Sequence, residues 1–118
     1  MQEQNRRRTG THYEERAAEW LTERGVQILM RNYRCRFGEI DLIGLDGPYL
    51  VFFEVKYRSG SRMGNAAAAV GRRKQETILN TARQFLAARH YRLDAPVRFD
   101  VIAVDAGIFS WYRNAFEA

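Results

Sequence analysis

The sequence predicts a single α/β domain in which a mixed central β-sheet is flanked by helices. Three observations support this class. The length of 118 residues suits one domain, two segments carry apolar residues at helical spacing, and several shorter segments carry the apolar runs and alternation of strands. We expect the elements in the order α-β-β-β-α-β, which is typical of a sheet covered by helices.

The polar N-terminal segment precedes the first helical pattern. It contains Arg6–Arg8 and ends at Gly10, so we expect residues 1–10 to form a flexible basic arm and residues 11–118 to form the domain. Residues 11–24 predict the first helix, and Gly25 is well placed to end it. The apolar residues that share one face of this helix are Tyr13, Ala17, Trp20 and Leu21.

Three strand signals follow this helix. Residues 26–29 predict a short strand, and residues 38–45 and 49–57 predict two longer strands. The two longer strands are separated by Asp46-Gly47-Pro48, and a connection that short predicts an antiparallel hairpin.

The C-terminal half predicts one more helix and at least one more strand. Residues 66–89 have the apolar stripe of a helix, and residues 97–104 form an apolar run typical of a buried strand. The aromatic segment 109–116 predicts either a strand end or a short helix. Core packing is the expected role of its aromatic side chains, and a homodimer contact is the alternative.

The charge of the chain indicates a polyanionic partner. The formal net charge is +5, from 19 basic and 14 acidic residues. No acid occurs between Glu54 and Glu76, and clustered cations without acids suit the phosphates of a nucleic acid. A solvated basic face is the alternative. The basic residues in this interval are Lys56, Arg58, Arg62, Arg72, Arg73 and Lys74.

Composition excludes several other classes. A single cysteine, Cys35, excludes an internal disulfide framework and a cysteine-cluster zinc site. No apolar run approaches the roughly 18 residues of a membrane span, and no secretory signal is evident, so we expect a cytoplasmic protein without membrane contact. The chain also lacks the glycine-rich loop of an NTPase.

The predicted hairpin brings two carboxylates together. Symmetric pairing about its turn places Asp41 directly opposite Glu54, and Lys56 lies on the same face of the strand as Glu54. Like charges in that arrangement repel, and Mg²⁺ or Mn²⁺ would offset the repulsion while leaving positions for phosphate oxygens. The alternative is an exposed charge ladder in which Lys56 and Arg58 pair with the two acids.

The segments Gly38-Glu39-Ile40-Asp41-Leu42-Ile43 and Val51-Phe52-Phe53-Glu54-Val55-Lys56-Tyr57-Arg58 resemble the D…(D/E)-x-K signature of restriction-endonuclease-like nucleases. From Gly10 to its end, the chain more closely resembles the YraN-like family of small bacterial proteins, which is placed in that superfamily. Further parts of the resemblance are Arg31-Asn32-Tyr33-Arg34, Lys74, Arg98-Phe99-Asp100-Val101 and Asn114-Ala115-Phe116.

The resemblance implies a restriction-endonuclease-like fold and a role for each residue of the motif. Asp41 and Glu54 match the metal-binding acids, and Lys56 matches the lysine of E-x-K. Glu14 matches an acid that many of these nucleases bring from the first helix; a carboxylate favoured in the first helical turn is the alternative. Ile40 stands where the pattern often has a proline.

The expected function is therefore Mg²⁺- or Mn²⁺-dependent hydrolysis of phosphodiester bonds in DNA, with branched or single-stranded DNA as the substrate. A non-catalytic nucleic-acid-binding module is the alternative, and a structural partner of an acidic protein is a third hypothesis. Tyr33 is expected in the core, with base stacking as its alternative. The residues expected to hold the nucleic acid are Arg34, Arg58, Arg62, Arg72, Arg73 and Lys74, with help from Arg6–Arg8.

Overall fold

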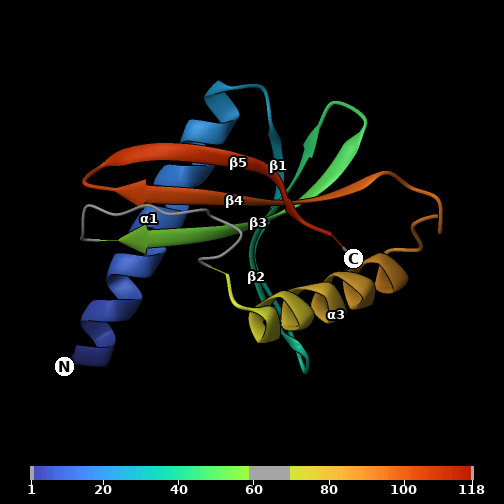
Figure 1. Cartoon of the computed structure of the whole chain (residues 1–118), viewed down its shortest axis with the longest axis horizontal. Coiled ribbons are helices and arrows are strands. Elements are labelled where there is room, and N and C mark those ends of the chain that lie inside the picture. The colour runs from blue at the N-terminus through green and yellow to red at the C-terminus, as the bar shows by residue number, and fades with distance from the viewer. Residues whose placement is uncertain (1, 59–69, 118) are drawn as a thin grey trace.

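The computed structural model describes residues 2–58 and 70–117; of residues 2–11 and 58 it describes the backbone alone. Within these residues, a five-stranded sheet is flanked by two helices (Figure 1), which confirms the expected α/β class and the mixed sheet. The elements are α1 Gln2–Glu23, β1 Gln27–Cys35, β2 Gly38–Asp46, β3 Tyr49–Arg58, α3 Arg72–Ala88, β4 Val97–Asp105 and β5 Ile108–Phe116.

The strands lie in the order β1-β2-β3-β4-β5. Neighbouring strands are antiparallel except for β3 and β4, which are parallel. A parallel pair needs a long crossover, and the connection that contains α3 supplies it. The expected hairpin is present as β2 and β3, with Leu45 paired to Leu50 and Asp46 paired to Tyr49.

Each helix covers its own apolar cluster. Successive side chains of a strand point to opposite faces, and on β3 Phe52 belongs to the cluster under α3 whereas Phe53 belongs to the cluster under α1. In Figure 1, α1 passes behind β3, β4 and β5, and α3 lies below the sheet. Because β3 is central and covered on both sides, most of its side chains are apolar, and a charged residue within it is unusual.

Two expected boundaries were wrong. The first strand was expected at 26–29 but extends to Cys35, because the basic stretch after Leu29 pairs with β2 along its length. Segment 109–116, expected as either a strand end or a short helix, is strand β5, so the order gains a final strand. The second helix begins at Arg72, after Gly71 in an extended conformation with φ −62° and ψ 162°; residues 66–69 lie outside the described residues.

The N-terminal segment also differs from the expectation. Residues 2–10, expected as a flexible arm, are the first turns of α1, and the helix continues through Gly10. A single glycine inside a helix costs only about 1 kcal/mol relative to alanine, and no proline interrupts the segment. In the described part of the chain, neither helix is long and apolar enough to cross a membrane.

Candidate metal and nucleic-acid site

The candidate site lies where β2 separates from β3. The two strands pair from Asp46 and Tyr49 as far as Leu42 and Phe53, in the register predicted from the turn. Beyond this pair, the backbone N–H of Val55 donates a 2.8 Å hydrogen bond to Oδ2 of Asp41. The side-chain oxygen of Asp41 thus accepts the hydrogen bond that a backbone carbonyl of β2 would otherwise accept. This bond holds Asp41 beside Glu54, the residue before Val55.

An irregularity in β1 and β2 accompanies this opening. Asn32 in β1 has a left-handed backbone with φ 52°, and its neighbours pair across to β2 on either side of Asp41. Ile40 and Ile43 both belong to the cluster under α3, whereas Leu42 belongs to the cluster under α1. Strict alternation would place Ile40 and Leu42 on one face, so the alternation shifts by one residue at Asp41.

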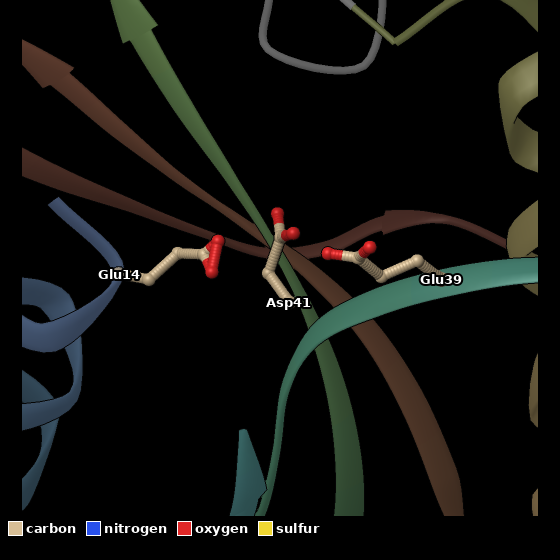
Figure 2. A group of neighbouring side chains, drawn as sticks. All are labelled: Glu14, Glu39 and Asp41. Carbon is tan, nitrogen blue, oxygen red and sulfur yellow. The ribbon is translucent and has the colours of Figure 1, made fainter. Parts of the chain in front are cut away.

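Three carboxylates meet at this point (Figure 2). Glu14 comes from α1, and Glu39 and Asp41 come from β2, with Asp41 between the other two. One oxygen from each carboxylate lies within 4.8 Å of the others. With its amide nitrogen turned toward the acids, Asn32 donates to Glu14 Oε1 at 2.6 Å and to Glu39 Oε1 at 3.1 Å.

Glu54 adds a fourth carboxylate from β3, and its side chain is only 7% exposed. Burial raises the pKa of Asp41 well above its ordinary value, and a hydrogen bond with Glu54 and the charge of Glu54 raise it further. Burial, together with the charge of Glu39, also raises the pKa of Glu14. Asp41 and Glu14 therefore retain protons more strongly than isolated acids do.

Two cations expected to hold nucleic acid lie against these acids. Lys74 Nζ, from α3, is 3.5 Å from Glu54 Oε2, and Arg34 Nε is 2.8 Å from Glu39 Oε2. Both basic side chains remain substantially exposed, at 47% and 73%. They therefore rim the carboxylate cluster, partly neutralise it, and still face solvent.

Lys56 is half-buried on β3, two residues beyond Glu54 on the same face. Among the described residues, none of the ion pairs involves Lys56. An ammonium group beside buried acids, and not paired with one of them, is suited to contact an anionic ligand.

The other expected nucleic-acid contacts are only partly placed. Arg72 and Arg73 are exposed in the first turn of α3, one turn or less from Lys74. Arg58 ends β3, but its side chain is not among the described parts of the structure, and the whole of Arg62 lies outside the described residues. The side chains of Arg6–Arg8 are outside it as well.

Sequence reasoning missed Glu39 and Asn32 as site residues. Glu39 could have been found, because it lies two residues before Asp41 and strand side chains two apart share a face. Asn32 gave no such signal, since its role depends on a left-handed backbone conformation. Tyr33 packs in the core as expected, edge-on to Phe85 with ring centroids 5.2 Å apart.

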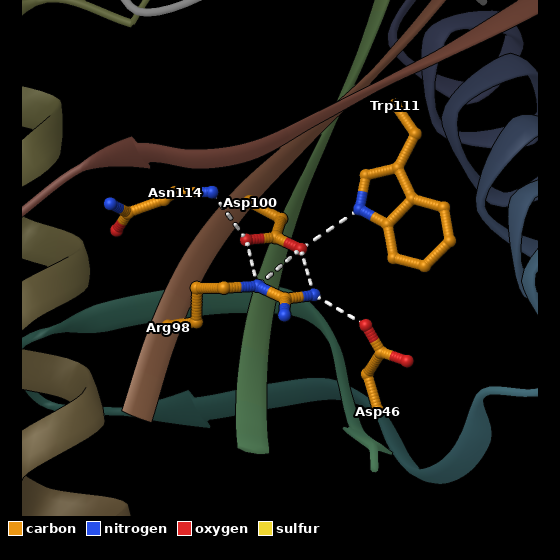
Figure 3. Close-up of polar contacts among 5 residues, drawn as sticks. All are labelled: Asp46, Arg98, Asp100, Trp111 and Asn114. Carbon is orange, nitrogen blue, oxygen red and sulfur yellow. Dashed lines mark hydrogen bonds and ion pairs between the residues drawn. The ribbon is translucent and has the colours of Figure 1, made fainter. Parts of the chain in front are cut away.

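A second polar cluster has a structural role (Figure 3). Asp100 is fully buried and accepts hydrogen bonds from Arg98, from the indole N–H of Trp111 at 2.8 Å and from the backbone N–H of Asn114 at 2.9 Å. Arg98 also donates to Asp46 at 2.7 Å, and both carboxylates raise its pKa. With its carboxylate satisfied by protein donors, Asp100 ties β4 to β5 and to the β2–β3 turn.

Three carboxylates are placed to hold a hard divalent cation. One oxygen each from Glu14, Glu39 and Asp41 lies within 4.8 Å of the others, and Mg²⁺ and Mn²⁺ prefer oxygen ligands. Glu54 neighbours Asp41 but is not one of these three. Neighbouring carboxylates raise the pKa of Asp41 and of Glu14, so a cation that replaced a proton there would relieve the repulsion. Asp41 and Glu54 are the expected ligands; Glu39 is added by the structure.

Comparison with known sequences identifies relatives along nearly the whole chain. A UPF0102 protein of Methylococcus capsulatus is 47% identical over 114 residues, covering 93% of this chain and 91% of the relative. One of Aeromonas hydrophila is 48% identical, with coverages of 91% and 83%, and one of Lachnoclostridium phytofermentans is 42% identical, with 97% of both chains covered.

The family profile leads to the same assignment. Residues 13–104 match the uncharacterised protein family UPF0102. This range contains Glu14, Asn32, Asp41, Glu54 and Lys74, so it spans α1, the hairpin and α3. The resemblance to the YraN-like family is thereby confirmed, and the chain belongs to the uncharacterised protein family UPF0102.

Proposed function

We propose that this protein is a Mg²⁺- or Mn²⁺-dependent DNA endonuclease with a restriction-endonuclease-like fold, acting in the cytoplasm. The observation that carries the proposal is the convergence of Asp41 and Glu54 where β2 leaves β3, with Lys56 beside them on β3. The D…E-x-K spacing in the sequence supports the same assignment.

Each side chain has a role that follows from its position. Asp41 and Glu54 would hold the cation, which when bound would polarise the phosphate and its attacking water. Glu14 reaches the same point from α1 and would ligate the cation or orient that water. Lys56 would hold the water near the scissile phosphate and stabilise the charge that develops on the phosphoryl oxygens.

Positive charge around the acids supports DNA as the substrate. The chain has a net charge of +5, and Arg72 and Arg73 are exposed next to Lys74 at the start of α3. These residues would contact the phosphate backbone, which positions a nucleic acid without selecting its sequence. We therefore propose that the protein recognises the shape of DNA and that its substrates are branched or single-stranded DNA.

A metal titration combined with a nuclease assay tests the proposal. Mn²⁺ and Mg²⁺ binding is measured by calorimetry for the wild type, Asp41→Asn, Lys56→Ala and the exposed control Asp94→Asn. Cleavage of branched, single-stranded and duplex DNA is measured beside it. We expect Asp41→Asn to lose metal binding and cleavage, Lys56→Ala to lose cleavage while retaining metal, and the control to match wild type. Wild-type protein that binds DNA but neither binds metal nor cuts would refute the enzyme.

A non-catalytic nucleic-acid-binding module is the second candidate. The contacts of Lys74 with Glu54 and of Arg34 with Glu39 favour it, because they partly neutralise the acids without a metal. In such a module Asp41→Asn removes a negative charge beside the basic residues, so it would tighten DNA binding. Binding measured without metal, over a range of salt concentrations, would reveal that outcome.

A further inference from the structure

A stacked tyrosine pair lies next to the carboxylate site but takes no part in it. Tyr57 of β3 stacks on Tyr13 of α1 with ring centroids 4.3 Å apart and ring planes 18° apart. Tyr57 nevertheless remains 44% exposed. Hydrogen bonding to Tyr57 raises the pKa of Tyr13. The contact orients the Tyr57 ring while leaving much of it open to solvent.

Both tyrosines are neighbours of site residues along the chain. Tyr13 immediately precedes Glu14, and Tyr57 immediately follows Lys56. Tyr57 is three residues beyond Glu54, which corresponds to about 10 Å along a strand. An unpaired strand is more extended than the roughly 3.4 Å rise of each strand in a stacked duplex, so this distance spans fewer than three nucleotides. A strand with its phosphate at the acids would thus carry a nearby base to the tyrosine pair.

The unpaired edge of β3 beyond Phe53 would let one ligand reach side chains on both faces of the strand. Beyond Phe53, β3 keeps β4 on one side, and within the described residues no strand pairs with it on the other. Lys56 and Tyr57 point to opposite faces of β3, yet both belong to this open edge. A nucleic-acid strand lying along the edge would place its phosphates near Lys56 and a base near Tyr57.

We propose that the Tyr13–Tyr57 pair is a stacking platform for an unpaired base of the DNA substrate. The inference rests on the proposed function and narrows its substrate to DNA with an unpaired nucleotide close to the cleaved bond. A base in a duplex has its faces covered by its neighbours, whereas an unpaired base offers a face to an aromatic ring. Duplex DNA would still contact the basic residues but would gain nothing from the platform.

Binding of a single-stranded oligonucleotide of about 12 nucleotides, labelled with 2-aminopurine, and of the matching duplex tests the proposal. The protein carries Asp41→Asn so that no strand is cut. Stacking on aromatic side chains changes affinity by about 5- to 150-fold per base. We expect Tyr57→Ala to weaken single-strand binding by about tenfold within that range and to leave duplex binding unchanged. Tyr57→Phe, which keeps the ring, should bind like the parent.

Tyr49→Ala is the matched control, because Tyr49 is 40% exposed at the opposite end of the same strand, and it should leave both affinities unchanged. The parent protein should also quench the 2-aminopurine fluorescence, a result that does not depend on how any Tyr57 variant folds. Absence of quenching, or an equal loss of single-strand and duplex binding in Tyr57→Ala, would overturn the platform.

The platform and the nuclease can fail separately. With Asp41 restored, metal-dependent cleavage that shows no preference for unpaired nucleotides would refute the platform and leave the nuclease standing. Stacking and single-strand preference without any metal-dependent cleavage would retain the platform and refute the enzyme.

Discussion

The carboxylate of Asp41 accepts a 2.8 Å hydrogen bond from the backbone N–H of Val55, the residue that follows Glu54. This bond replaces the next rung of the β2–β3 ladder, which ends at Leu42 and Phe53. It also leaves the second oxygen of Asp41 available for the carboxylate cluster. The same side chain thus completes the sheet and supplies the site, so its substitution affects both.

Metal affinity should depend on pH. Burial and Glu54 raise the pKa of Asp41. At a pH between the ordinary aspartate pKa and this raised one, Asp41 still holds a proton, and a cation must displace that proton in order to bind. We expect Mn²⁺ affinity to rise with pH, by up to about tenfold per pH unit for one displaced proton, until pH exceeds the raised pKa. Calorimetry in buffers of different ionisation enthalpy would count the released protons. A Mn²⁺ affinity that does not change with pH, or binding that releases no proton at any pH, would contradict the prediction.

Asp41→Asn should stabilise the metal-free protein at neutral pH. A carboxyl whose pKa is raised on folding binds its proton more tightly in the folded state, so wild-type stability falls as pH rises from the ordinary aspartate pKa through the raised one. Asparagine can still accept from Val55 but removes the repulsion with Glu54. We expect a gain on the order of 1 kcal/mol, or roughly 4 °C in Tm. The gain should vanish near pH 4, where Asp41 is protonated; a gain independent of pH would indicate another cause.

Lys74→Ala should separate metal binding from DNA binding. The ammonium group lies 3.5 Å from the buried Glu54 carboxylate, where it competes with a divalent cation for the same charge. We expect the variant to bind Mn²⁺ several-fold more tightly, and to bind DNA more weakly because one phosphate contact is lost. Arg73→Ala is the matched control, since Arg73 is exposed and precedes Lys74 in α3. Arg73→Ala should weaken DNA binding while leaving Mn²⁺ affinity unchanged. If Arg73→Ala raised Mn²⁺ affinity as much as Lys74→Ala does, competition between Lys74 and Mn²⁺ for Glu54 would be ruled out.

Asp100→Ala should destabilise the fold without acting on the carboxylate site directly. Asp100 is fully buried, and its loss leaves Arg98, whose side chain is 12% exposed, without the carboxylate that accepts most of its hydrogen bonds. Removing one member of a buried ion pair costs about 3–5 kcal/mol. Urea unfolding would measure this loss. The exposed pair of Asp94 with Arg92 is the control, and Asp94→Ala should cost less than about 1 kcal/mol. Equal losses for the two variants would refute the structural role of Asp100.

The sequence by itself determined the features that depend on short covalent connections. The turn at 46–48 brings two strands together in the predicted register, which the ladder follows as far as Leu42 and Phe53, the pair next to Asp41 and Glu54. Helical spacing in residues 11–24 and 66–89 likewise predicted the helices observed as α1 and α3, because an apolar stripe depends only on neighbouring positions along the chain.

Only the tertiary structure decided how separate elements meet at the site. Glu14 reaches Asp41 because α1 packs across the sheet, and Lys74 reaches Glu54 because α3 covers the opposite face. The extension of β1 through Arg31–Arg34 escaped prediction, since an edge strand with exposed basic residues lacks a clear apolar alternation. Such contacts arise from packing between residues distant in the chain, and no local spacing in the sequence encodes them.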